Sequence, residues 1–145
     1  MQTVLVINSS ANGDASVSGS LAARFVDRLR ECEPGLELVL RDVGANPVPH
    51  LTAETVAAIK GTPASDAETA ARSLSDALIA ELQAADLIVI ASPMYNFGMS
   101  STLKSWFDHV LRAGVTFRYT ESGPEGLLKG KKAVVIESRG GLYSE

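Results

Sequence analysis

Short hydrophobic stretches alternate along this chain with longer stretches in which hydrophobic and polar residues are mixed. Three of the short stretches are rich in β-branched residues, and they span residues 3–7, 87–91 and 133–136. Such runs predict strands that are buried on both faces, as in a parallel sheet. Residues 36–43 alternate instead, with leucines at positions 36, 38 and 40. This alternation predicts a strand nearer to an edge of the sheet.

Between the predicted strands, hydrophobic residues recur every three to four positions, which predicts amphipathic helices. The repeating positions are Leu21, Phe25 and Leu29 in the first, Leu74, Leu78 and Leu82 within residues 70–82 in the second, and Leu103, Phe107, Val110 and Leu111 in the third. Strands that alternate with helices imply right-handed crossovers and an open, doubly wound α/β sheet. Because no repeat, low-complexity tract or linker interrupts the pattern, we expect residues 1–145 to form a single domain.

Two segments do not fit this alternation. Residues 44–65 contain three prolines and predict an irregular connection with a short helix near residues 52–60. Residues 115–128 contain glycine and proline between aromatic residues and predict an inserted loop or hairpin before the last strand. That insertion could fold over the ends of the strands.

Charge and cysteine content exclude several classes of function. The formal net charge is -4, the isoelectric point is near 5.2, and the basic residues are scattered, so nucleic acid and anionic membranes are poor partners. No apolar stretch approaches the roughly 20 residues that span a bilayer. Cys32 is the single cysteine, which excludes an internal disulfide and a CxxC pair and fits the reducing cytoplasm.

Ligands of open α/β sheets bind beyond the carboxyl ends of the strands, where the strand order reverses. This rule selects three loops: a first loop that begins at residue 8, a second loop over residues 92–98 and a third loop over residues 138–141. We expect these three loops to meet at one site.

The first loop is rich in serine directly before the first predicted helix. Hydroxyl groups and free backbone N–H groups at the positive end of a helix bind phosphate monoesters, and Ser10, Ser16 and Ser18 are the candidates. The alternative is that Ser16 or Ser18 only caps the helix. No GxGxxG follows the first strand and no GxxxxGK[ST] occurs anywhere, which argues against a dinucleotide-binding Rossmann site and an ATPase.

The second and third loops contain groups that suit a planar heteroaromatic ring. Tyr95 and Phe97 offer apolar surface beside the carboxamide of Asn96, although these aromatic residues could equally belong to the core. In the third loop, two glycines permit close backbone approach, and Arg139 could stabilise negative charge on a reduced ring. Arg139 could otherwise be an ordinary surface cation.

With these loops in place, the sequence resembles the FMN-dependent NADH-azoreductases, also described as NADH:quinone oxidoreductases, of the flavodoxin-like group. The matching motifs are Ser9-Ser10, Ser16-Val17-Ser18, Arg41-Asp42, Ala45-Asn46-Pro47, Pro93-Met94-Tyr95-Asn96-Phe97, the run from Arg112 to Glu121, Gly123 to Leu127, and Ser138-Arg139-Gly140-Gly141. They follow one another in the expected order over nearly the whole chain, which makes the resemblance highly specific.

The resemblance implies a three-layer α/β/α flavodoxin-like fold and a cytoplasmic homodimer with FMN near the subunit interface. Two electrons would pass from NADH or NADPH through FMN to a quinone or azo compound in a ping-pong scheme. By motif, Ser10, Ser16, Val17 and Ser18 would hold the FMN phosphate. The ring would be contacted by Met94, Tyr95, Asn96, Phe97, Ser138, Arg139, Gly140 and Gly141, while Phe117 and Tyr119 would shape the substrate pocket.

This chemistry needs no acid–base triad and no metal, because the flavin performs the transfer. We therefore expect His50 and His109 to have structural or interface roles. The family pattern continues beyond residue 145 with a fifth strand and a final helix, so we expect the fourth strand to form an exposed edge. Two alternatives stay open at this point: a flavodoxin-type electron carrier, and a folded module that binds no flavin.

Overall fold

A four-stranded parallel sheet forms the centre of the molecule. The computed structural model describes residues 2–143, and its strands are β1 (Thr3–Asn8), β2 (Glu37–Asp42), β3 (Leu87–Pro93) and β6 (Lys132–Ser138). They lie in the order β2-β1-β3-β6, with every neighbouring pair parallel. The predicted doubly wound α/β sheet is therefore confirmed.

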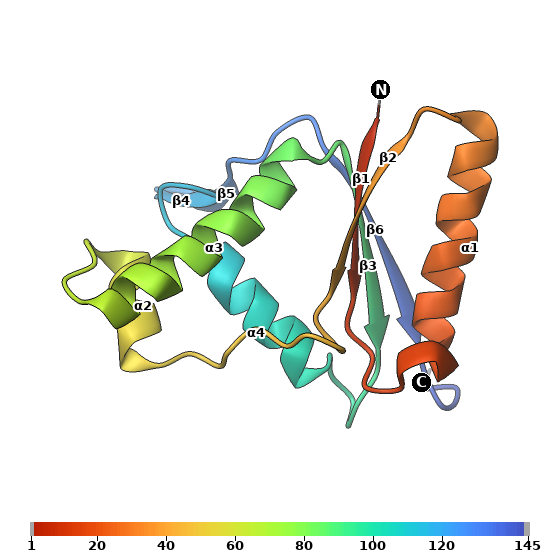
Figure 1. The fold of residues 1–145 in the computed structure, drawn as a ribbon, viewed down its shortest axis with the longest axis horizontal. Coiled ribbons are helices and arrows are strands. Elements are labelled where there is room, and N and C mark those ends of the chain that lie inside the picture. Colours follow the sequence, from red (N-terminus) through yellow and green to blue (C-terminus); the bar gives the residue numbers. More distant parts are fainter. Residues whose placement is uncertain (1, 144–145) are drawn as a thin grey trace.

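Helices cover both faces of this sheet, which gives the expected three layers (Figure 1). The long helix α1 (Val17–Cys32), preceded by the short helix η1 (Gly13–Ala15), lies on one face. On the other side are α3 (Asp66–Ala84), α4 (Ser101–Val110) and the short α2 (Ala53–Lys60), which packs against α3. The predicted short helix in the proline-rich connection is thus confirmed.

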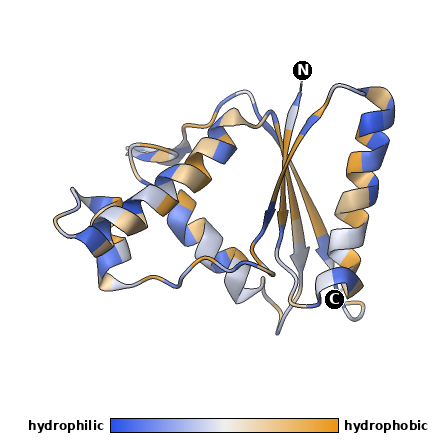
Figure 2. Ribbon diagram, in the orientation of Figure 1, coloured by the Kyte–Doolittle hydropathy of each residue, from blue (hydrophilic) through white to orange (hydrophobic). Residues whose placement is uncertain are grey.

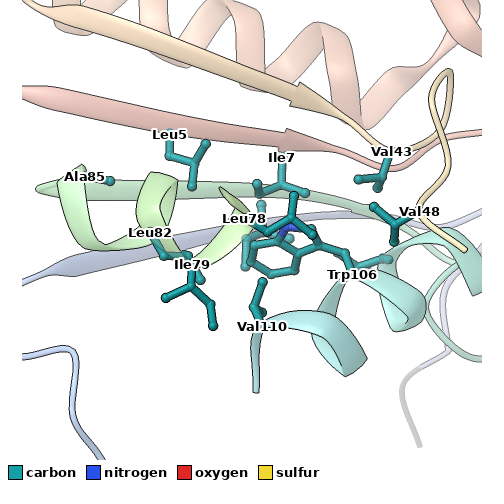
Figure 3. Packing of buried hydrophobic residues seen from close by; sticks show 12 residues of the cluster. Leu5, Ile7, Val43, Val48, Leu78, Ile79, Leu82, Ala85, Trp106 and Val110 are labelled. Atoms are coloured by element: carbon teal, nitrogen blue, oxygen red, sulfur yellow. The ribbon is translucent and has the colours of Figure 1, made fainter. Parts of the chain in front are cut away.

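Two hydrophobic cores separate the layers, and Figure 2 shows the strands between them coloured mainly as hydrophobic. In the larger core, the indole of Trp106 on α4 lies against the sheet beside Ile7 and Leu78 (Figure 3). The smaller core lies under α1 and contains Val6, Ala22 and other residues of β1, β3 and α1. Burial of these side chains fixes which helix lies on which face.

Three details of the predicted burial were wrong. Strand β6 is not buried on both faces, since Val135 is 62% exposed; among the described residues it is an edge strand of the sheet, as expected for the fourth strand. In α1 the fully buried stripe runs through Ser18, Ala22 and Val26 rather than through Leu21. Leu111 follows the last residue of α4 and is exposed.

The insertion before the last strand forms the hairpin that was predicted as one possibility. Its strands are β4 (Phe117–Thr120) and β5 (Gly123–Gly126), which pair antiparallel. Figure 1 shows the hairpin beside the helical layer of α3, away from the start of α1. None of the helices within residues 2–143 combines the length and apolar character that crossing a membrane requires.

Candidate functional site

The three loops at the carboxyl ends of β1, β3 and β6 border one hollow of about 240 Å³, which we call the three-loop pocket. Its lining residues are Asn12, Ala15, Val17, Pro93, Met94, Tyr95, Ser138, Arg139 and Gly140. The rule that ligands bind beyond the carboxyl ends of parallel strands therefore selects a real cavity here.

Hydrogen bonds between distant segments hold the three loops together. The backbone N–H of Met94 donates to the carbonyl of Ser138 at 2.8 Å, which joins the second loop to the third. The backbone N–H of Ala11 donates to the Tyr95 hydroxyl at 3.0 Å, which joins the first loop to the second. Because these bonds fix the loops relative to one another, the shape of the pocket is largely preformed.

In the first loop, the serines bond mainly to their own segment. Ser16 is the N-cap of α1, since its hydroxyl accepts from the backbone N–H of Gly19 at 3.0 Å, and it lies 3.3 Å from the hydroxyl of Ser18. The hydroxyl of Ser10 accepts from the N–H of Asn12 at 3.1 Å. The capping role is thus confirmed for Ser16. Because Val17, the first residue of α1, lines the pocket, the positive end of the helix borders it as well.

The second loop contains a strained turn. Tyr95 and Gly98 exchange two backbone hydrogen bonds of 2.8 and 3.0 Å, while Asn96 and Phe97 between them have φ values of 49° and 64°. Such left-handed conformations are costly for a bulky residue like Phe97 and are typically retained at functional sites. Phe97 is 79% exposed, so the alternative that it belongs to the core is wrong.

The third loop supplies the only charged side chain among the described residues that line the pocket. The guanidinium of Arg139 donates to the Glu137 carboxylate at 2.9 Å, and both side chains are more than 40% exposed. An exposed ion pair of this kind contributes little to stability. Arg139 is therefore free to reorient toward an anionic group with little loss of folding energy.

Gly44 packs against the backbone of the first loop at Ser10. The sequence alone did not identify this residue. A Cβ atom added to Gly44 would overlap the carbonyl oxygen of Ser10 and lie 2.9 Å from its carbonyl carbon. Only a residue without a side chain fits this close approach of two backbone segments. The available signal was its place two residues after Asp42, which is the last residue of β2.

The two substrate-pocket candidates, Phe117 and Tyr119, lie elsewhere in the chain. Phe117 and Tyr119 border a separate hollow of about 420 Å³ together with Ile59, Lys60, Leu111 and Ala113, which we call the hairpin pocket. The two pockets share no lining residue. The chain therefore does not bring Phe117 or Tyr119 to its own three-loop pocket.

Both histidines are engaged in packing contacts away from the three-loop pocket. His109 is 1% exposed, and its Nδ1 lies 2.8 Å from the carbonyl oxygen of Ser105. The Nδ1 of His50 lies 3.1 Å from the hydroxyl of the same serine. These contacts fit the structural role that was expected for both residues.

Comparison with known proteins places this geometry in a family. The model of the flavodoxin-like fold matches residues 2–145. An FMN-dependent NADH:quinone oxidoreductase of Hyphomonas neptunium is 59% identical over 145 residues, which cover 100% of this chain and 70% of that protein. The chain belongs to this family of flavodoxin-like oxidoreductases. A member from Azotobacter vinelandii is 52% identical, with 99% of this chain and 73% of that protein covered.

Solved structures of azoreductases agree with this membership in the FMN-dependent NADH:quinone oxidoreductase family. An azoreductase from Bacillus anthracis str. Sterne superposes with a TM-score of 0.87 at 30% identity, covering 100% of this chain and 72% of that chain. An FMN-dependent NADH-azoreductase from Bacillus anthracis str. Ames Ancestor, in complex with FMN, gives 0.86 at 26% identity, covering 99% and 72%. These family members are longer than this sequence, as the resemblance implied.

Proposed function

We propose that this chain is an FMN-dependent oxidoreductase that transfers two electrons from NADH or NADPH to quinones and azo compounds in ping-pong order. The observation that carries the proposal is the three-loop pocket, whose walls are tied together by the Met94–Ser138 and Ala11–Tyr95 hydrogen bonds. Family membership adds the chemistry, because the relatives are named as FMN-dependent NADH:quinone oxidoreductases.

The residues of the pocket fit FMN in both of its parts. The start of α1 borders the pocket at Val17 and would offer a phosphate the positive end of a helix dipole. The hydroxyl groups of Ser10, Ser16 and Ser18 lie behind this lining, at most 8% exposed, and would turn toward the phosphate. The ring would lie between the Met94–Phe97 segment and the Ser138–Gly141 segment, which are joined at their base. Bound there, FMN would supply the hydride and electron transfer.

The protein's own side chains then have orienting and electrostatic tasks. The described lining contains no Asp, Glu, His or Lys, and its one phenol, Tyr95, accepts a hydrogen bond from Ala11, so no side chain of the pocket is assigned a role in general acid–base catalysis. Arg139 would turn from Glu137 toward negative charge that develops on the ring. Tyr95 would keep the phosphate-binding loop and the ring-binding loop in register through its hydroxyl.

The substrate side of the pocket would be completed by a second subunit in a cytoplasmic homodimer. Phe117 and Tyr119 border the hairpin pocket and cannot serve the three-loop pocket of their own subunit, but Tyr119 is 75% exposed and free to contact another chain. Val17, which lines the three-loop pocket, and Phe97 and Met99, which follow its lining residue Tyr95 in the chain, are exposed apolar residues. Exposed apolar residues of this kind support a protein interface there.

The test begins with FMN added to the purified chain and removal of the excess. Retained flavin absorbance, NADH oxidation that depends on a quinone, and parallel lines in double-reciprocal initial-rate plots would establish the proposal. Bound flavin that NADH cannot reduce would indicate an electron carrier. Protein that keeps no flavin would contradict the proposed function altogether.

A further inference from the structure

An aromatic pair joins the second loop to the segment after the third loop. The rings of Phe97 and Tyr143 meet edge to face, with their centroids 5.2 Å apart and their planes at 73°. The ring of Tyr143 also folds back over Gly141, where an added Cβ would lie 3.7 Å from its Cζ and hydroxyl oxygen. Tyr143 thus contacts the second loop at Phe97 and the third loop at Gly141. Neither of these two residues lines the three-loop pocket itself.

Phe97 needs such a contact more than an ordinary surface residue does. Its backbone is in the left-handed region at φ 64°, and its ring is 79% exposed, so neither backbone preference nor burial fixes the ring. The two backbone hydrogen bonds between Tyr95 and Gly98 hold the strained backbone, but they do not fix the ring of Phe97. Among the aromatic pairs of the described residues, only the one with Tyr143 involves Phe97.

We propose that Tyr143 is a positioning residue that holds Phe97 beside the three-loop pocket and thereby selects flat aromatic electron acceptors. This inference rests on the proposed function, and it assigns to Tyr143 the selection among classes of electron acceptor. Two rings at 73° form a corner in which a planar molecule stacks on one ring and meets the edge of the other. A small inorganic acceptor gains nothing from this corner.

The test compares three variants of the full chain loaded with FMN. Tyr143→Leu removes the aromatic ring and keeps apolar bulk, while Tyr143→Phe keeps the ring and removes the hydroxyl. Leu142→Ala is the matched control, since Leu142 is the adjacent apolar residue and is 97% exposed. Thermal unfolding checks that all three variants fold like the unmodified chain.

For Tyr143→Leu we expect the KM of a bicyclic naphthoquinone to rise about two- to tenfold, as the loss of an aromatic pair implies. Its kcat, and the KM for ferricyanide, should stay unchanged, and Tyr143→Phe should restore the KM of the unmodified chain. Binding of 2-naphthoate, which is redox-inert, to the oxidised holoprotein should weaken by the same factor. The perturbation of the flavin absorbance measures this binding without turnover.

Three results would overturn the positioning role: an unchanged KM in Tyr143→Leu, an equal rise of the ferricyanide KM, or an equal effect of Leu142→Ala. Failure of the proposed function looks different, because the unmodified chain would then retain no FMN or would not oxidise NADH. In that case the positioning role falls with it. An active unmodified chain with an unaffected Tyr143→Leu variant overturns the positioning role alone.

Discussion

Gly44, two residues after the end of β2, lies against the backbone of Ser10, so that a Cβ on Gly44 would come within 2.9 Å of the carbonyl carbon and 3.1 Å of the amide nitrogen of Ser10. The backbone N–H groups of Val43 and Gly44 both donate to the carbonyl of Asn8, at 2.8 and 3.3 Å. The segment after β2 thus packs against the backbone of the first loop and holds it in place. The position of Ser10 depends on this packing.

Replacement of Gly44 should disturb the first loop, although Gly44 itself does not line the three-loop pocket. In Gly44→Ala, the new methyl group meets backbone rather than a flexible side chain, so we expect a loss of about 1–3 kcal/mol in the free energy of unfolding. FMN should also bind more weakly, because Ser10 is displaced. Urea unfolding and quenching of free FMN fluorescence measure the two effects.

Gly35→Ala is the control for this change, since an added Cβ at Gly35 has no atom within 4 Å. A glycine replaced without strain leaves stability equal or raised by up to about 1 kcal/mol. FMN affinity should not change. If Gly44→Ala had the same stability and FMN affinity as Gly35→Ala, the close approach of Gly44 to Ser10 would not contribute to folding or FMN binding.

Ser16 should contribute to both folding and FMN binding, and a second helix cap separates the two effects. The hydroxyl of Ser16 accepts from Gly19 at the start of α1, and that of Ser65 accepts from Glu68 at the start of α3. Ser16→Ala and Ser65→Ala should each cost about 1 kcal/mol of stability. Only Ser16→Ala should weaken FMN binding. Equal FMN affinity in the two variants would mean that Ser16 is a cap and nothing more.

Features of the site that depend on local sequence patterns could be predicted, whereas features that depend on contacts between distant segments could not. The strand runs and the serine, aromatic and glycine-rich loops were found because local patterns and one topological rule determine them. The support that Gly44 gives to Ser10 could not be predicted, since it depends on how β2 lies against β1. Tyr143 was missed for the same reason, because its contact with Phe97 joins segments distant in sequence.

The misjudged burial has a similar origin. In α1, the four-residue spacing of Leu21, Phe25 and Leu29 is the clearest local signal. Phe25 and Leu29 do pack against the smaller core, but the fully buried positions are Ser18, Ala22 and Val26. Small residues at the contact allow the helix to approach the strands closely. Composition alone could not show this, because a stripe of serine, alanine and valine has little hydrophobic contrast.

The Tyr95 hydroxyl should matter through the loop it holds rather than through its ring. In Tyr95→Phe the aromatic surface is kept, but the backbone N–H of Ala11 loses its acceptor. The loss of one hydrogen bond corresponds to about 0.5–1.5 kcal/mol, which predicts an FMN dissociation constant about two- to tenfold higher. Fluorescence titration measures it. An unchanged constant would show that the first loop keeps its position without this bond.

Acidification should loosen the hairpin that carries Phe117 and Tyr119. Hydrogen bonds from Arg118 and Lys129 lower the pKa of the Glu125 carboxyl group below its ordinary value. The stabilisation is therefore present above the ordinary pKa, about 4.3, and is lost as the pH falls through the lowered value. Near-ultraviolet circular dichroism between pH 6 and 3 should report the change. In the Glu125→Gln variant, the part of this spectral change that arises from protonation of the Glu125 carboxylate should be absent.

Arg112 should stabilise the fold far more than an arginine on the surface. Its side chain is 5% exposed, and its Nη1 donates to Ser75 at 3.0 Å and to Asp76 at 2.6 Å. Arg112→Ala should cost about 2–3 kcal/mol, since charge-assisted hydrogen bonds and packing are lost together. Arg28, whose pair with Glu31 is at least 63% exposed on both sides, is the control, and Arg28→Ala should change stability by less than about 1 kcal/mol. Comparable losses in urea unfolding would contradict the weight given to burial.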